Sequence, residues 1–89
     1  MIAEWRPAEI RYFVIEMFEE LVPIPCTLKH LDETVRLQDG RQVARCYRAH
    51  GLFAMWMISV GLLQFYDEQG NMLRTVNLLE ERELSRAAA

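Results

Sequence analysis

The residues of this sequence best suited to hold a metal ion are its two cysteines and two histidines, which form two units of equal spacing. Cys26 and His30 are four residues apart, and so are Cys46 and His50. Thiolate and imidazole are common ligands of Zn²⁺, which binds four of them in a tetrahedron. Residues four apart share a face of a helix or a strand, so each unit could offer one sulfur and one nitrogen. A Cys₂His₂ zinc site is therefore one hypothesis.

Two features favour the alternative, in which no cofactor is bound. Common structural zinc sites pair cysteine with cysteine at short spacing, whereas each unit here pairs cysteine with histidine. If the strand that contains residues 34–38 extended back to Cys26, the first unit would lie on the opposite face of the sheet from the second. We therefore expect Cys46 to be a small core residue and both histidines to be surface or loop residues.

A second candidate site consists of arginines next to an aromatic ring. Two segments that we expect to pair as a hairpin carry these side chains, and the pairing places all of them on one face. They are Arg36, Arg41, Arg45 and Tyr47. Guanidinium groups beside a ring suit an anionic small ligand or single-stranded nucleic acid. A solvated sheet face is the competing interpretation, and the net charge of −3 makes nucleic acid an unfavourable partner.

Catalysis has little support in the sequence. The residues that could take part in catalysis are scattered along the chain, and nothing in their spacing predicts a nucleophile next to a base. They are Cys46, His50, Asp32 and Glu33. The sequence contains no Gly-rich phosphate loop, no Gly-x-Ser-x-Gly and no His-Glu-x-x-His. We therefore favour a protein without catalytic activity.

The elements that must position these residues begin with a helix from Pro7 to about Leu21. Proline suits a first helical turn, and Pro23 and Pro25 prevent continuation. The apolar residues follow the 3.6-residue period of one buried stripe: Ile10, Phe13, Val14, Met17, Phe18 and Leu21.

Residues 34–38 and 41–47 flank Asp39-Gly40, a pair typical of a two-residue hairpin turn. A strict hairpin pairs Gln38 with Arg41 and Val35 with Ala44. This register predicts an apolar face of Leu31, Val35, Leu37, Ala44 and Cys46, and an opposite face of Thr34, Arg36, Arg41, Arg45 and Tyr47.

Residues 51–66 contain no charged side chain. The run is shorter than the roughly 20 apolar residues of a membrane span, so we expect no membrane insertion. We interpret it as a buried strand, bent at Gly61, with a helix over 52–58 followed by a strand over 62–66 as the alternative. Residues 67–71 then form a hairpin loop before a strand over 72–76. Asn77, with Glu80 three residues later, predicts the N-cap of a short C-terminal helix.

These elements predict a single α+β domain over residues 1–89, with the order α-β-β-β-β-α and a small four-stranded antiparallel sheet covered by the N-terminal helix. Apolar residues make up 52% of the chain, which is slightly more than ordinary domains contain. The start of the chain lacks the features of a signal peptide, so we expect a cytoplasmic protein with reduced cysteines. The favoured function is a protein-interaction or regulatory module that binds another protein or itself, as a homodimer formed through leftover apolar surface or a sheet edge.

Overall fold

The computed structural model describes residues 5–80 of the chain. Its first element is helix α1 (Pro7–Leu21), which begins and ends where the prolines predict. The backbone N–H of Arg6 donates to the Glu9 carboxylate at 2.9 Å, and the N–H of Val22 closes the last turn on the Phe18 carbonyl at 2.9 Å. Ile10, Val14 and Phe18 are buried as the periodicity requires, and Ile15 joins them.

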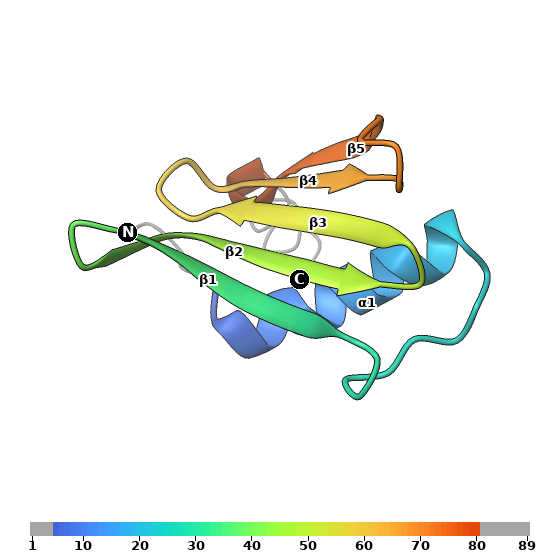
Figure 1. Cartoon of the computed structure of the whole chain (residues 1–89). Helices are drawn as coiled ribbons and strands as arrows, with labels where there is room; N and C mark the ends of the chain where they lie inside the picture. Colours follow the sequence, from blue (N-terminus) through green and yellow to red (C-terminus); the bar gives the residue numbers. More distant parts are fainter. Residues whose placement is uncertain (1–4, 81–89) are drawn as a thin grey trace, which may run out of the picture.

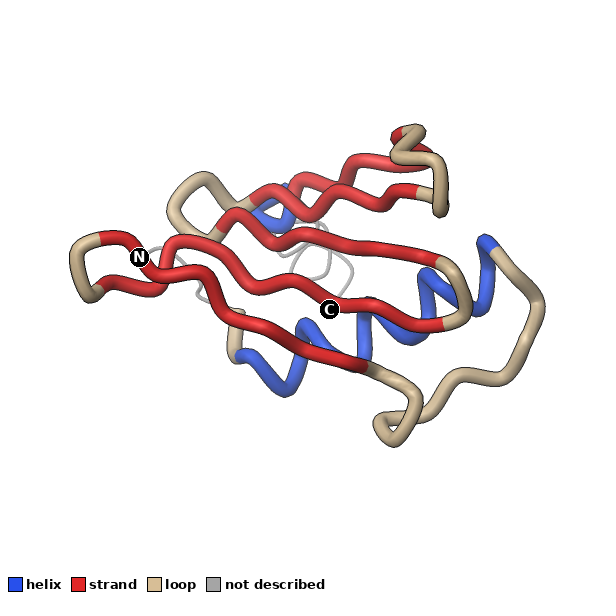
Figure 2. The backbone as a smooth tube through the Cα atoms, in the orientation of Figure 1, coloured by secondary structure: helices blue, strands red, loops and turns tan. Residues whose placement is uncertain are grey.

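The sheet has five strands, not the four expected. They are β1 (Asp32–Gln38), β2 (Arg41–Ala49), β3 (Leu52–Met57), β4 (Leu62–Tyr66) and β5 (Met72–Asn77). All neighbours are antiparallel, and the order in space follows the order in sequence (Figures 1 and 2). A small α+β domain is confirmed.

The additional strand comes from the uncharged run, where neither a single bent strand nor a helix is present. The chain reverses between β3 and β4, and the N–H of Gly61 bonds the Met57 carbonyl at 3.0 Å. Gly61 has φ = +66°, which side chains disfavour, so this glycine makes a turn where a bend was expected. The run is therefore a hairpin whose two strands are both apolar.

The pairing of β1 with β2 departs from a strict hairpin after its first residues. Gln38 pairs with Arg41 as expected, but Val35 pairs with Arg45 and not with Ala44. The register shifts between Arg36 and Leu37 because the β2 strand carries one extra residue there, a β-bulge. A shift of one residue moves every later side chain to the other face, so the predicted sorting of faces is wrong beyond the bulge.

The core lies between α1 and one face of the sheet. Phe18 of α1 meets Phe65 of β4 edge to face, with ring centroids 5.8 Å apart. Trp5 folds back onto the same layer: its Nε1 donates to the Leu78 carbonyl at 2.9 Å, and its ring packs edge-on against Phe13. The fully buried core side chains from both layers include Ile10, Val14, Tyr47, Ala54, Leu63, Phe65 and Leu78.

The C-terminal helix begins at Leu78 as expected. The Asn77 side-chain oxygen accepts hydrogen bonds from the N–H groups of Leu79 and Glu80, at 3.1 and 3.2 Å, which is N-cap geometry. Its predicted continuation over residues 81–89 lies outside the described residues. Between residues 5 and 80, no helix has the length and apolar character needed to cross a membrane.

Candidate functional site: the open face of the sheet

Helix α1 covers one face of the sheet, and the other face, here called the open face, has no layer over it among the described residues (Figure 1). Strand pairing arranges its side chains in three parallel rows that cross all five strands from β1 to β5. The first row is Asp32, Arg48, Phe53, Tyr66 and Met72. The middle row is Thr34, Cys46, Met55, Gln64 and Thr75. The third row is Arg36, Ala44, Met57, Leu62 and Asn77.

The open face has an apolar centre and a mostly polar rim. Its members on the three central strands are mainly apolar, and those that line the middle are half-buried or buried: Ala44, Cys46, Phe53, Met55, Met57, Leu62 and Tyr66. Its members on the edge strands β1 and β5 are mainly polar and exposed: Asp32, Thr34, Arg36, Thr75 and Asn77. This distribution is the one found in protein–protein interfaces, where an apolar centre is surrounded by a solvated polar rim.

Two shallow hollows lie at opposite ends of the open face, one beside each outer row. The larger, of about 720 Å³, lies at the end of the first row and is bordered by the β2–β3 turn and the β4–β5 loop. A smaller one, of about 480 Å³, lies at the third row between Arg36 and Met57. Met55 borders both hollows. Because Ala44 and Cys46 are small, β2 forms the floor between the polar side chains of β1 and the large apolar side chains of β3.

The walls of the larger hollow include aromatic rings and a cation. The Phe53 and Tyr66 rings lie 5.9 Å apart, and the Arg48 guanidinium sits over the Phe53 ring at 5.1 Å. The Tyr66 hydroxyl donates to Gln64 Oε1 at 2.8 Å. These contacts hold large side chains in fixed positions on the surface, which lowers the entropy lost when a partner covers them.

The structure brings the two histidines together but not the four candidate zinc ligands. The His30 and His50 rings lie 5.1 Å apart, where they join the 22–31 loop to the β2–β3 turn. His50 Nε2 is 3.2 Å from the Pro25 carbonyl oxygen, and the Thr27 N–H donates to His30 Nδ1 at 3.2 Å. Both rings are exposed, and these contacts tie down a loop.

The two cysteines are buried in different places. Cys26 belongs to the core on the helix side, where burial, and then the charge of Glu19, raises the pKa of its thiol. Cys46 lies in the middle row of the open face. Within residues 5–80, no three His, Cys, Asp or Glu side chains are grouped so that they could hold a metal ion.

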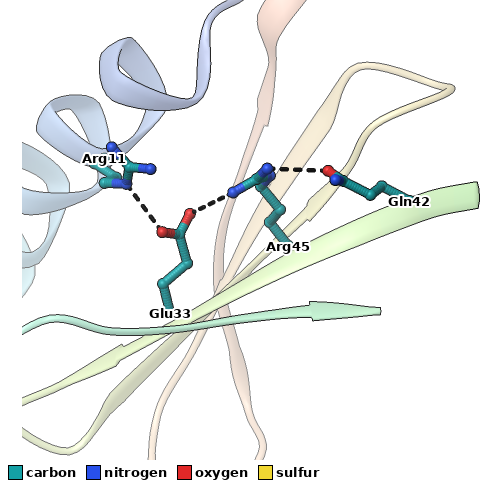
Figure 3. A network of polar contacts seen from close by, with 4 residues as sticks. All are labelled: Arg11, Glu33, Gln42 and Arg45. Atoms are coloured by element: carbon teal, nitrogen blue, oxygen red, sulfur yellow. Dashed lines mark hydrogen bonds and ion pairs between the residues drawn. The ribbon is translucent and has the colours of Figure 1, made fainter. Parts of the chain in front are cut away.

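The four residues of the arginine set do not share one face. Arg36 lies in the third row of the open face, whereas the bulge turns Arg45 and Tyr47 toward α1, and Arg41 follows the β1–β2 turn. Arg45 is held between two side chains, with Nη1 3.1 Å from Glu33 Oε2 and Nη2 2.9 Å from Gln42 Oε1 (Figure 3).

Glu33 links the helix to the sheet. Its Oε1 accepts from Arg11 Nε of α1 at 2.9 Å, while its Oε2 accepts from Arg45 (Figure 3). Burial alone would raise the pKa of Glu33, but the Arg11 and Arg45 guanidinium groups outweigh it and hold that pKa below its ordinary value. Arg45 therefore has a structural partner inside the protein.

Tyr47 is fully buried beside this network. Burial, followed by the neighbouring Glu33 carboxylate, raises the pKa of its hydroxyl far above the ordinary value. The Glu33 carboxylate lies near this hydroxyl, but among the described residues no group meets both the distance and the angle of a hydrogen bond to it. A ring in this position belongs to the core and is not exposed for stacking on a ligand.

The sequence predicted leftover apolar surface but did not locate it on one face of the sheet, although β3 carried a signal. Its six residues, Leu-Phe-Ala-Met-Trp-Met, are apolar at every position, so both faces of the strand are apolar. A strand with one solvated face alternates apolar with polar residues, and an unbroken apolar strand is covered on both sides. In this structure α1 covers one face of β3, and the other face of β3 belongs to the open face.

Comparison with known proteins adds no relative. No protein-family model matches the chain, and neither a curated protein nor a solved structure matches it significantly. The functional interpretation therefore depends on the residues and on their geometry.

Proposed function

We propose that the protein is a non-catalytic interaction module that binds a protein surface through the open face of its sheet. The observation that carries this proposal is the apolar centre with a polar rim, on a face that no other described element covers. Contiguous apolar surface of this kind marks interaction sites in small proteins, because leaving it in water is unfavourable.

The side chains of the centre support the same function. Met55 and Met57 are flexible and polarisable, and such residues adapt to the shape of a partner. Phe53 and Tyr66 provide large rings of the type that dominates binding energy in interfaces. The expectation of a cytoplasmic location remains a prediction beside this proposal.

Site-specific photo-cross-linking in cells tests the proposal. A benzoyl-phenylalanine placed at Met57 lies in the third row of the open face, and the matched control places it at Glu16, which is exposed on α1. We expect illumination to produce a covalent protein adduct from position 57 and none from position 16. Absence of an adduct from position 57, or equal adducts from both positions, would contradict the proposal.

A further inference from the structure

We propose that the partner of the open face is a second copy of the same chain, packed face to face about a two-fold axis that runs along the middle row. This inference rests on the proposed function, because it names the partner of the same surface. It is carried by the arrangement of charge and side-chain size in the three rows.

The charges of the edge strand β1 are complementary under this symmetry. Asp32 lies at the first-row end of β1 and Arg36 at the third-row end, with Thr34 between them in the middle row. Rotation by 180° about the middle row places the first row of each copy over the third row of the other. Asp32 of one copy then faces the partner's Arg36, and the same pair recurs at the symmetry-related position. Both side chains are exposed, and within residues 5–80 neither takes part in an ion pair.

Side-chain sizes match under the same operation. Arg48 lies opposite the partner's small, recessed Ala44, which leaves room for its side chain while its guanidinium stays over the Phe53 ring of its own copy. Phe53 lies over the partner's Met57, a favourable sulfur–aromatic combination. Tyr66 lies over the partner's Leu62, so the apolar parts of the first and third rows cover each other.

The other simple symmetry is less favourable. An axis along β3 would place β1 of one copy over β5 of the other, so Asp32 would face Met72 and Arg36 would face Asn77. Both charges would then be desolvated or turned aside without a partner of opposite sign, which costs free energy. Asp32 and Arg36 therefore select the axis along the middle row, whereas Arg48 faces no acidic residue under either axis and does not distinguish them.

The area of the open face gives an expectation for the dissociation constant of the dimer. Strands about 4.8 Å apart and rows about 6.6 Å apart give the face a footprint of about 24 by 20 Å. Two such footprints bury about 1,000 Å² in total, which is at the lower limit for a specific interface. We therefore expect a dimer with a dissociation constant in the micromolar range.

Charge exchange in the purified full chain tests the inference. Sedimentation equilibrium from about 5 to about 500 μM spans the expected transition. We expect Asp32→Arg and Arg36→Asp each to raise the dissociation constant at least about tenfold, because each creates like-charge contacts at both symmetry-related positions. The double variant exchanges the charges and should return to within about threefold of the wild type. The controls Glu16→Arg and Lys29→Asp make the same charge changes outside the open face and should have no effect.

Milder variants keep the test informative if a charge reversal affects folding. Asp32→Asn and Arg36→Gln remove a charge without adding repulsion, and each should weaken the dimer by about threefold. A wild-type chain that stays monomeric over the whole range would overturn the inference, and so would a double variant no better than the weaker single variant. If position 57 cross-links to a different protein while the purified chain is monomeric, the second-copy inference fails but the proposed function stands.

Discussion

Replacement of Glu33 by alanine tests whether the Arg11–Glu33–Arg45 network holds the helix on the sheet. The two carboxylate oxygens bind different arginines, and only 15% of the Arg45 side chain and 20% of the Glu33 side chain are exposed. Without Glu33, Arg45 stays mostly desolvated and keeps only Gln42 as an acceptor. An unpaired charge of this kind costs about 2–3 kcal/mol of unfolding free energy. Arg11 is 36% exposed, so Arg11→Ala should cost only about 0.5–1 kcal/mol.

The pH dependence of stability gives a second, independent measure of the network. The folded-state pKa of Glu33 lies below its ordinary value of 4.5, so the unfolded chain takes up a proton first as the pH falls. The stabilisation is therefore fully present well above pH 4.5 and is lost as the pH falls through the folded pKa. Glu33→Gln removes this titration and nearly preserves the shape of the side chain. The difference in unfolding free energy between this variant and the wild type should therefore shrink as the pH falls, because the wild type loses its stabilisation in the same pH window.

Urea unfolding followed by tryptophan fluorescence measures both effects. With a slope near 1 kcal/mol per M, Glu33→Ala should lower the midpoint at pH 7 by about 2 M. Glu16→Gln is the matched control, because Glu16 is exposed on α1 and forms no ion pair within residues 5–80. A Glu33→Ala midpoint within about 0.3 M of the wild type would show that the network does not hold the helix on the sheet. So would a Glu33→Gln loss of unfolding free energy that is the same at pH 7 and pH 3.5.

Three further substitutions test other parts of the structure. Tyr47→Phe removes a buried hydroxyl that has no partner in hydrogen-bonding geometry within residues 5–80, so thermal unfolding should show unchanged or slightly raised stability. A loss above about 1 kcal/mol would mean that the hydroxyl bonds the neighbouring Glu33 carboxylate. Asn77→Ala should cost about 1 kcal/mol in chemical denaturation through loss of the N-cap, and no loss would contradict that role. Gly51→Ala and Gly40→Ala should each cost about 1 kcal/mol in the same assay, because both glycines have positive φ and the nearest atoms to a Cβ at position 51 belong to the exposed Glu68 side chain, which can move aside. A loss at position 51 that is larger by more than about 1 kcal/mol would show that Glu68 is held in place.

The sequence predicted the elements that have strong local signals. The prolines and the 3.6-residue period placed α1, and Asp39-Gly40 placed the β1–β2 turn with its first pair of residues. Asn77 correctly predicted the start of the last helix. Each of these features is decided by a few neighbouring residues, which is why a single sequence was sufficient.

The face assignments failed because they depend on events without a local signal. One extra residue in β2 turns Arg45 and Tyr47 toward the core and Cys46 toward the open face, and no turn residue marks the bulge. Within the charge-free run, only Ser59 and Gly61 mark the separation between the two strands, and this weak turn signal did not distinguish a turn at Gly61 from a bend. The location of the apolar surface was not predicted for the same reason, since its rows exist only in the paired sheet.

NMR of methionine methyl groups, recorded as the protein concentration is raised from about 10 μM to about 1 mM, tests directly whether the open face self-associates. Met55 and Met57 lie on the open face, whereas Met17 belongs to α1 and packs against the core on the opposite side of the sheet. We expect concentration-dependent shifts for the Met55 and Met57 methyl groups and none for Met17. Constant Met55 and Met57 signals over this range, or shifts confined to Met17, would contradict self-association through the open face.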